Sequence, residues 1–232
     1  MGISRNIVSK EEWQEARKAF LKKEKAHLKA ADALSAERRA LPWVEITENY
    51  QFDGPDGKVG LAELFKDHNQ LIIQHFMYGP EWEAGCPGCS LMADSHQGVH
   101  THLEQAGVRL VVISNGPLDK LDAYKKRMGW GFEWYSSLGS PFNYDFDVSF
   151  TAEQIEQGDG QYNYAPKQGD MTELHGVSCF YKDDDGKIYH TYSTYSRGVD
   201  TLMGVYQYID LTPLGRQEDG PMSWLKRHDE YV

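Results

Sequence analysis

Two runs of apolar residues constrain the fold of this chain more than any other feature: "QLIIQHFMY" at 70–78 and "VRLVVIS" at 108–114. Near-continuous apolar runs of this length are typical of strands that are buried on both faces of a sheet. The segment between them, "SLMADSHQGVHTHLEQAG", has the length and pattern of a helix. This succession therefore predicts two parallel strands joined by a helical crossover.

The rest of the chain from residue 43 extends this pattern. We expect a strand at 43–52, a turn at 53–57, a short helix at 61–65, a helix at 117–129 and a third strand at 132–137. Residues from about 150 to 172 form an irregular insertion. A β-hairpin around an Asp-Gly turn follows at 176–194, and a closing helix at 198–210. The order predicts an α/β fold with a mixed sheet flanked by helices.

A long helix precedes this domain. Ser9 and Glu12 have the spacing of a capping box, and helix-forming residues continue to Ala40, before Pro42. Its narrow apolar stripe among many charges favours a helix packed on the main domain over a dimerisation helix, which leaves a homodimer possible. We therefore expect an N-terminal helical extension at 1–42, a main domain at 43–210 and a polar tail at 211–232.

Composition limits the classes of partner. The 232 residues are 40% hydrophobic and 25% charged, as in a globular protein, and the net charge is −11. This negative balance argues against partners that need a positive field, such as nucleic acid or an anionic membrane surface. The first residues contain no apolar stretch of the signal-peptide kind, and no window approaches a membrane span, so we expect a cytoplasmic protein.

The most informative short motif is "CPGC" at residues 86–89, directly after the first buried strand and at the start of the following helix. Three cysteines are too few for a disulfide scaffold, so a Cys-x-x-Cys pair here favours redox chemistry or metal binding. If the helix begins near Pro87, the sulfur of Cys86 lies at its N-terminus, where N–H groups and the helix dipole favour a thiolate. Cys89 lies one turn further on and could resolve a mixed disulfide formed by Cys86.

This arrangement resembles the thioredoxin fold, and the third strand with the leading "YQFDGPDG" is similar to its peroxiredoxin-like branch. Six motifs, "HFMYGPEWEAGCPGCS", "YKKRMGWGFEWYSS", "FNYDF", "HTYSTYSRG", "YIDLTPLGR" and "WLKRHDEY", look typical of one bacterial group. On these motifs the chain is identified as a member of the thioredoxin-like family catalogued as domain of unknown function 899. The resemblance covers about residues 43–231 and implies a thioredoxin-like fold with Cys89 facing inward.

The same resemblance assigns roles to four further residues. His75 stands where thioredoxin has a buried acid beneath the resolving cysteine, and a histidine there could relay protons to Cys89. The alternative is a core histidine with a backbone partner. His175 and Gly176 stand where thioredoxin-like proteins place a cis-proline that contacts substrate, so the substrate-gripping edge is expected to differ. Trp82 is expected on the rim of the site, where an aromatic ring could contact a substrate.

These residues predict a thiol–disulfide oxidoreductase with Cys86 as nucleophile, Cys89 as resolver and His75 as proton relay. We expect no cofactor and no metal, and a disulfide-containing protein or a small-molecule thiol as the partner. One alternative is a metal-binding module built on the two cysteines with His175 and His75. Another is a peroxiredoxin-like peroxidase, which ranks lower because the residues between Pro80 and Cys86 include no hydroxyl but include two glutamates, which would oppose a thiolate.

Two other motifs could suggest metal binding, but a structural interpretation is favoured for each. His96, His100 and His102 are expected to be surface histidines on the helix rather than zinc ligands. The run "DDDG" at 183–186 is expected to form the hairpin turn, because it lacks the ligand spacing of a calcium loop.

Overall fold

The structure is a computed structural model that describes residues 6–231. The chain divides into two compact units, residues 1–42 and 43–232. The expectation that the chain begins without a signal peptide depends largely on residues 1–5, which lie outside the described part. Within residues 6–231, no helix combines the length and the apolar character that a bilayer crossing requires.

The first unit is the helix α1, Lys10–Arg39. The capping box expected from the sequence is present: the Ser9 hydroxyl accepts from the backbone N–H of Glu12, and the Glu12 carboxylate accepts from the backbone N–H of Ser9. Glutamates in the first turn and arginines in the last turn complement the helix dipole. None of the described side chains of α1 is buried.

The second unit contains an eight-stranded mixed sheet in the order β1-β10-β9-β4-β5-β6-β2-β3. Strands β4, β5 and β6 are parallel, as the strand–helix–strand pattern predicts, and β9 pairs with β4 in the antiparallel sense. The bounds of the strands of this sheet are: β1 Val44–Glu45, β2 Gln51–Gly54, β3 Gly57–Gly60, β4 Gln70–His75, β5 Val108–Ser114, β6 Trp134–Ser136, β9 Gly176–Lys182 and β10 Ile188–Tyr195.

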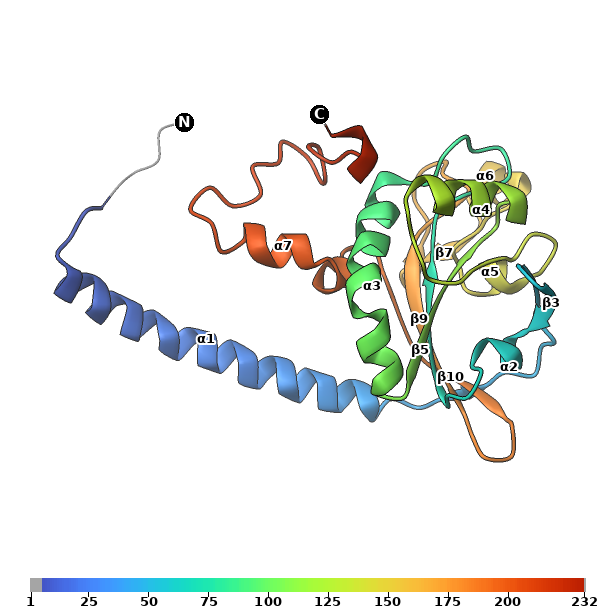
Figure 1. The fold of residues 1–232 in the computed structure, drawn as a ribbon, viewed down its shortest axis with the longest axis horizontal. Helices are drawn as coiled ribbons and strands as arrows, with labels where there is room; N and C mark the ends of the chain where they lie inside the picture. The colour runs from blue at the N-terminus through green and yellow to red at the C-terminus, as the bar shows by residue number, and fades with distance from the viewer. Residues whose placement is uncertain (1–5, 232) are drawn as a thin grey trace. The chain divides into compact units, whose positions relative to one another are not determined.

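Helices cover both faces of this sheet, and Figure 1 shows α3 and α7 on one side of the strands and α2 and α5 on the other. A separate two-stranded ribbon, β7 with β8, lies in the insertion at 150–172. The remaining bounds are: α2 Leu61–Leu64, α3 Pro87–Gln105, α4 Leu118–Arg127, α5 Phe142–Asp145, α6 Ala152–Gln157, β7 Gln161–Tyr162, β8 Ala165–Pro166, η1 Ser196–Leu202 (a 3₁₀ helix), α7 Gly204–Ile209 and η2 His228–Glu230 (also 3₁₀).

Alternation along β4 separates the two faces of the core. Leu71 and Ile73 pack in one apolar cluster with residues of α2 and α5. Phe76, just beyond the strand, packs in the other cluster with Cys89 of α3 and Leu121 of α4. A central strand that packs against an apolar cluster on each side must be largely apolar on both faces, which explains the near-continuous apolar run.

The parallel core strands, the helix after β4 and the closing hairpin β9–β10 form the thioredoxin-like fold in its peroxiredoxin-like variant. The fold class expected from the sequence is therefore confirmed. The "DDDG" run forms the hairpin turn, where the Asp183 carboxylate accepts from the backbone N–H groups of Asp185 and Lys187. Gly186 has a φ of +83°, a left-handed conformation that glycine adopts without steric cost.

Two expected elements are divided in the structure. The strand expected at 43–52 is two short strands: β1 at one edge of the sheet, and β2 next to the strand at the other edge, β3. The closing helix expected at 198–210 is the 3₁₀ helix η1 followed by α7, with Met203 in an extended conformation between them. Met203 is buried in a third apolar cluster with Met92 and Tyr206, and this packing holds the break in place.

Candidate active site

The cysteine pair lies at the junction of β4 and α3. Cys86 is the N-cap residue of α3, and Pro87 occupies the first helical turn, where its missing N–H costs no hydrogen bond. Inward-facing residues then recur at helical spacing and pack α3 against the sheet: Cys89, Met92, Ala93 and His96. The predicted start of the helix and the inward orientation of Cys89 agree with this geometry.

The loop after β4 holds both cysteines through one residue, Met77. The backbone N–H of Cys86 donates to the carbonyl of Met77 over 3.1 Å, and the backbone N–H of Met77 donates to the sulfur of Cys89 over 3.4 Å. Gln74 adds a third contact, because its side-chain amide donates to the carbonyl oxygen of Cys89 over 3.1 Å. The strand therefore fixes the position of the sulfur atoms before any substrate binds.

The two sulfurs differ in their preference for charge. A hydrogen bond from the Cys89 thiol, with further ones from the backbone N–H groups of Cys89 and Gly88, lowers the pKa of Cys86 to about 6 against the opposing effect of burial. Burial, followed by the neighbouring Cys86, raises the pKa of Cys89 well above its ordinary value. Near neutral pH the pair therefore holds a thiolate at Cys86 and a thiol at Cys89.

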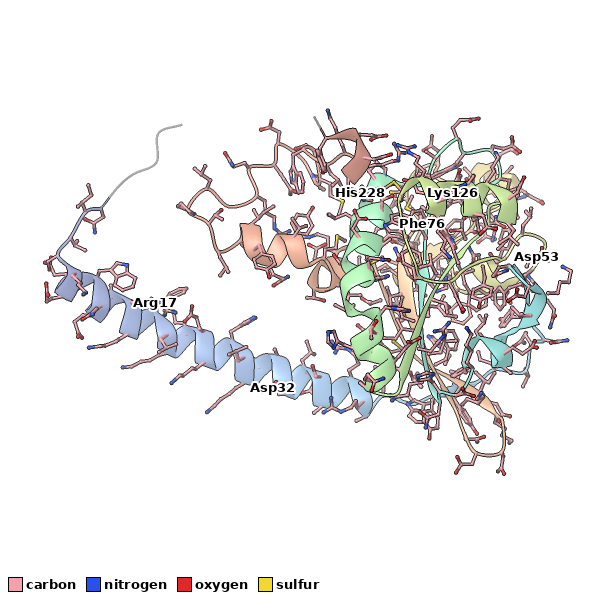
Figure 2. All side chains as sticks on the ribbon, in the orientation of Figure 1. Arg17, Asp32, Asp53, Phe76, Lys126 and His228 are labelled. Carbon is pink, nitrogen blue, oxygen red and sulfur yellow. The ribbon has the colours of Figure 1, made fainter. Side chains whose placement is uncertain are left out.

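Arg227, in the C-terminal segment 211–231, adds positive charge to this site. Its guanidinium donates two hydrogen bonds to the carbonyl of Gly85, at 3.0 and 2.7 Å, and its charge contributes to the lowered pKa of Cys86. His228 bonds Asp94 of α3 over 2.7 Å. Figure 2 shows His228 beside the first turns of α3. The expected polar tail thus belongs to the cysteine site.

A cavity of about 280 Å³ borders both cysteines. Thioethers and aliphatic carbons make up most of its wall, so the space beside the thiolate is apolar. The thioether sulfur of Met222 lies within 3 Å of the point where a Cβ on Gly88 would stand, and the Cys86 sulfur lies 3.9 Å from that point. The lining residues are Cys86, Pro87, Gly88, Cys89, Met92, His175, Met203, Met222 and Leu225.

The structure does not bring His75 to the cysteines. Alternation turns its ring to the opposite face of the sheet, where it stacks on Phe142 and Phe146, and Nε2 lies 2.7 Å from the hydroxyl of Ser178. The residue of β4 that contacts Cys89 is Gln74. Complete burial lowers the pKa of His75 to about 3, so the ring is neutral at physiological pH. The expected proton relay through His75 therefore has no geometric support here.

His175 directly precedes β9, and Gly176 is its first residue. This is the place, just before the hairpin, where thioredoxin-like proteins were expected to have the cis-proline. His175 lines the cavity, and its Nε2 lies 3.2 Å from the carbonyl of Ser196. Burial lowers the pKa of His175. Gly176 pairs with β4 and β10 and does not line the cavity. The ring of Tyr195 occupies the position of a Cβ on Gly176, which explains the glycine there.

Two other expected positions differ in the structure. Trp82 is half-buried against Gly79 and the cluster around Phe76, and it is not among the residues that line the cavity. His96 was expected at the surface of α3 and is buried instead. It lies on the same helical face as Cys89, and burial lowers its pKa to about 4.

A metal site was the alternative to redox chemistry. Within the described part of the chain, no three or more His, Cys, Asp or Glu side chains come together in a group that could hold a metal ion. The imidazole of His75 faces away from the two sulfurs, and that of His175 is bonded to Ser196. The ligand set proposed from the sequence is therefore not assembled.

Several residues of the site gave no signal in the sequence. Met203, Met222 and Leu225 belong to segments more than 100 residues from the cysteines. Tyr162, in the insertion, accepts from the backbone N–H of Ser196 and donates to the carbonyl of His175, and its burial raises its pKa to about 12. Only the position of the C-terminal motif "WLKRHDEY" within the family resemblance pointed toward that end of the chain.

The fold and the site together define a thioredoxin-fold protein with a Cys-x-x-Cys pair at the start of the helix after the first core strand. The chain belongs to the family described as bacterial protein of unknown function (DUF899), whose sequence profile matches residues 3–231. This confirms the family suggested by the six motifs. No curated protein matches the chain significantly.

Solved structures similar to this chain include several peroxiredoxins. Peroxidoxin BcpB from Mycobacterium tuberculosis is 14% identical, with 70% of this chain and 94% of that chain covered and a TM-score of 0.47. A cysteine-to-serine mutant of peroxiredoxin Q from Xanthomonas campestris is 13% identical, with 71% and 96% covered and a TM-score of 0.48. Yeast mitochondrial 1-Cys peroxiredoxin is 12% identical, with 73% and 78% covered and a TM-score of 0.41.

Proposed function

We propose that the protein is a thiol–disulfide oxidoreductase in which Cys86 is the nucleophile and Cys89 the resolving thiol. One observation carries the proposal: Cys86 is the N-cap residue of α3, and Cys89 lies one turn further on in hydrogen-bond contact with it. This arrangement lowers the pKa of Cys86 to about 6 and raises that of Cys89. A thiolate at Cys86 attacks a disulfide, and a thiol held in hydrogen-bond contact is positioned to resolve the product. The reducing cytoplasm, which we propose as the location, keeps such a pair in the dithiol form.

The backbone supports the same division of roles. When Cys86 carries charge, the N–H groups of Gly88 and Cys89 at the start of α3 stabilise it. When Cys89 must lose its proton to attack, the N–H of Met77 stabilises the new thiolate from the strand side. Each sulfur has its own backbone donor for the step in which it is charged.

Single-turnover kinetics with the prereduced protein test this proposal. We expect Cys86→Ser to reduce the rate of disulfide reduction by at least about a thousandfold, because a serine hydroxyl is not ionised near neutral pH. Cys89→Ser should accumulate a mixed disulfide on Cys86, visible by mass spectrometry. Cys179→Ser, a change in β9, is the matched control and should react as the wild type does. Unchanged reduction by Cys86→Ser would contradict the assigned role.

A peroxidase is the second candidate function. The observation that favours it is Arg227, whose charge acts on Cys86 and could stabilise the oxygen that leaves a peroxide. No serine or threonine lies between residues 76 and 86 to bind the peroxide from the loop side. We therefore expect hydrogen peroxide to oxidise Cys86 more slowly than a disulfide does. Stopped-flow comparison at equal concentrations of the two oxidants decides between them.

A further inference from the structure

We propose that the substrate of this site is a small apolar disulfide that binds in the cavity beside Cys86, and that protein disulfides are excluded. This inference rests on the proposed function and adds the class of substrate. Three features of the structure support it: the apolar wall of the cavity, the C-terminal segment that covers it, and the hydrogen bonds that occupy the neighbouring backbone edge.

The first feature is the character of the cavity. At about 280 Å³ it is at the small end of ligand-binding pockets, and it adjoins the sulfur that carries the charge. Three methionines, Met92, Met203 and Met222, contribute to the wall. Methionine side chains are flexible and polarisable, so such a wall adapts to alkyl groups and contacts aryl rings favourably. A charged substrate would lose its hydration there without gaining a partner.

The second feature is the cover over the cavity. Met222 and Leu225 of the C-terminal segment form part of the wall, and ion pairs and hydrogen bonds hold this segment on the domain. Arg127 of α4 binds Asp229 over 2.6 Å, and the hydroxyl of Tyr206 in α7 donates to Glu218 over 3.1 Å. Together with the Arg227 and His228 contacts, these interactions close the side of Cys86 from which a folded partner would approach.

The third feature is the backbone edge before β9. A polypeptide substrate that adds to this edge needs the main-chain N–H and C=O groups of the edge for its own hydrogen bonds. Here the carbonyl of His175 already accepts from the hydroxyl of Tyr162 over 2.8 Å. The same hydroxyl accepts from the backbone N–H of Ser196 over 3.0 Å. An extended peptide would have to displace Tyr162 to bind there.

The protein, its substrate and one proton from solvent balance the chemistry of one turnover. The Cys86 thiolate attacks one sulfur of R–S–S–R, forming a Cys86–S–S–R bond and releasing R–S⁻, which takes up a proton. The Cys89 thiol loses its proton and attacks the Cys86 sulfur, which releases the second thiolate. The products are two R–SH molecules and the Cys86–Cys89 disulfide; the substrate gains the two electrons that the cysteine pair loses.

A series of dialkyl disulfides tests the proposal with the full-length protein. Diethyl, dipropyl and dibutyl disulfide have similar intrinsic reactivity, and each rate is divided by the rate with free dithiothreitol. We expect the normalised rate to rise about fourfold for each methylene that enters the cavity. Bis(2-hydroxyethyl) disulfide, glutathione disulfide and insulin serve as the polar, charged and protein probes, and each should react at least about tenfold more slowly than dibutyl disulfide.

Two substitutions connect this selectivity with the cavity. Met222→Trp should fill the cavity and so remove the dependence of the rate on chain length. Leu225→Asp should remove the same dependence by placing a charge in the cavity wall. The control Leu211→Trp adds the same indole at an exposed position of the same segment and should keep the wild-type dependence. The far-ultraviolet circular dichroism of each variant reports whether it is folded. If the Met222 variant is unfolded, the Leu225 variant tests the proposal.

Each other outcome has a definite meaning. A flat rate across the alkyl series, or reduction of insulin as fast as dibutyl disulfide, would overturn the substrate class and leave the oxidoreductase intact. Faster reaction with cumene hydroperoxide than with dibutyl disulfide would overturn it in favour of the peroxidase. If no disulfide reacts at all, the proposed function itself fails.

Discussion

On one face of β4 the chain stabilises a charge, whereas on the other face it excludes one. Toward α3, backbone N–H groups and Arg227 favour the thiolate of Cys86. Toward α5, His75 lies between aromatic rings, and its Nδ1 has no hydrogen-bond partner among residues 6–231. His75 is fully buried and Cys86 is half-buried, and burial opposes charge at both, so burial alone does not decide ionisation. The difference lies in whether the backbone directs donors at the group.

The buried polar groups on the α5 face form a continuous chain. His75 Nε2 lies 2.7 Å from the Ser178 hydroxyl, which lies 2.7 Å from the Ser193 hydroxyl, which lies 2.7 Å from His190 Nε2. Hydrogen bonds of this kind satisfy neutral groups and offer no counter-charge, and burial lowers the pKa of both histidines. These polar groups are therefore neutral within an apolar cluster, and protonating either histidine costs the folded state free energy.

The largest expected effect is on acid stability. The pKa of His75 is about 3 in the folded state and near 6.5 in the unfolded chain, so below pH 6.5 only the unfolded state binds this proton. The stability contribution is therefore present above pH 6.5 and is lost as the pH falls, by about 1 kcal/mol per pH unit. Urea unfolding at about pH 7 and about pH 5 measures this loss together with those of His96, His175 and His190, whose pKa values burial also lowers.

His75→Gln isolates this contribution, because glutamine does not titrate and can still bond Ser178. We expect the variant to be less stable near neutral pH but to lose roughly 2 kcal/mol less than the wild type between the two pH values. His27→Gln, at an exposed position of α1, should keep the wild-type pH dependence. The same pH dependence in His75→Gln as in the wild type would contradict the assignment of His75 as neutral in the folded protein.

A smaller effect is expected on the thiolate face. Cys89→Ala removes the hydrogen bond that contributes most to the lowered pKa of Cys86. Because a hydrogen bond to a charged group contributes about 1.5 to 3 kcal/mol, the pKa of Cys86 should rise by roughly one to two units. The pH profile of alkylation by iodoacetamide, with the modified residue located by mass spectrometry, gives this pKa. Cys179→Ala is the control. If the pH profile of alkylation is the same in Cys89→Ala as in the wild type, the Cys89 hydrogen bond is not the main cause of the lowered pKa.

The smallest effect is expected from Arg227, whose charge is the last of the contributions to the pKa of Cys86. Arg227→Gln should raise that pKa by less than about one unit, and salt should weaken the difference because the guanidinium is partly exposed to solvent. Arg127→Gln loosens the same segment but leaves the Arg227 charge in place. If both variants shift the profile equally, the effect comes from the cover and not from the charge.

Local patterns in the sequence predicted the elements that depend on local physics. The capping box at Ser9, the start of α3 at Pro87, the buried strands and the turn at Gly186 follow from hydrogen-bond geometry and residue shape within a few positions. The predictions failed where a residue had two possible faces. His75 and His96 were assigned wrong surroundings because the sheet register and the packing of distant segments decide them.

The sequence by itself determined the fold class, the family and the cysteine pair at a helix start, because each is encoded in contiguous residues with fixed periodicity. The tertiary structure alone decided the surroundings of those sulfurs: a methionine-lined cavity, a cover from the C-terminal segment, and Gln74 rather than His75 against Cys89. For the cavity and its cover the physical reason is distance along the chain, because contacts between residues more than a hundred positions apart leave no periodic pattern in one sequence. For Gln74 and His75 the reason is the packing of α3, which decides which face of β4 lies against Cys89.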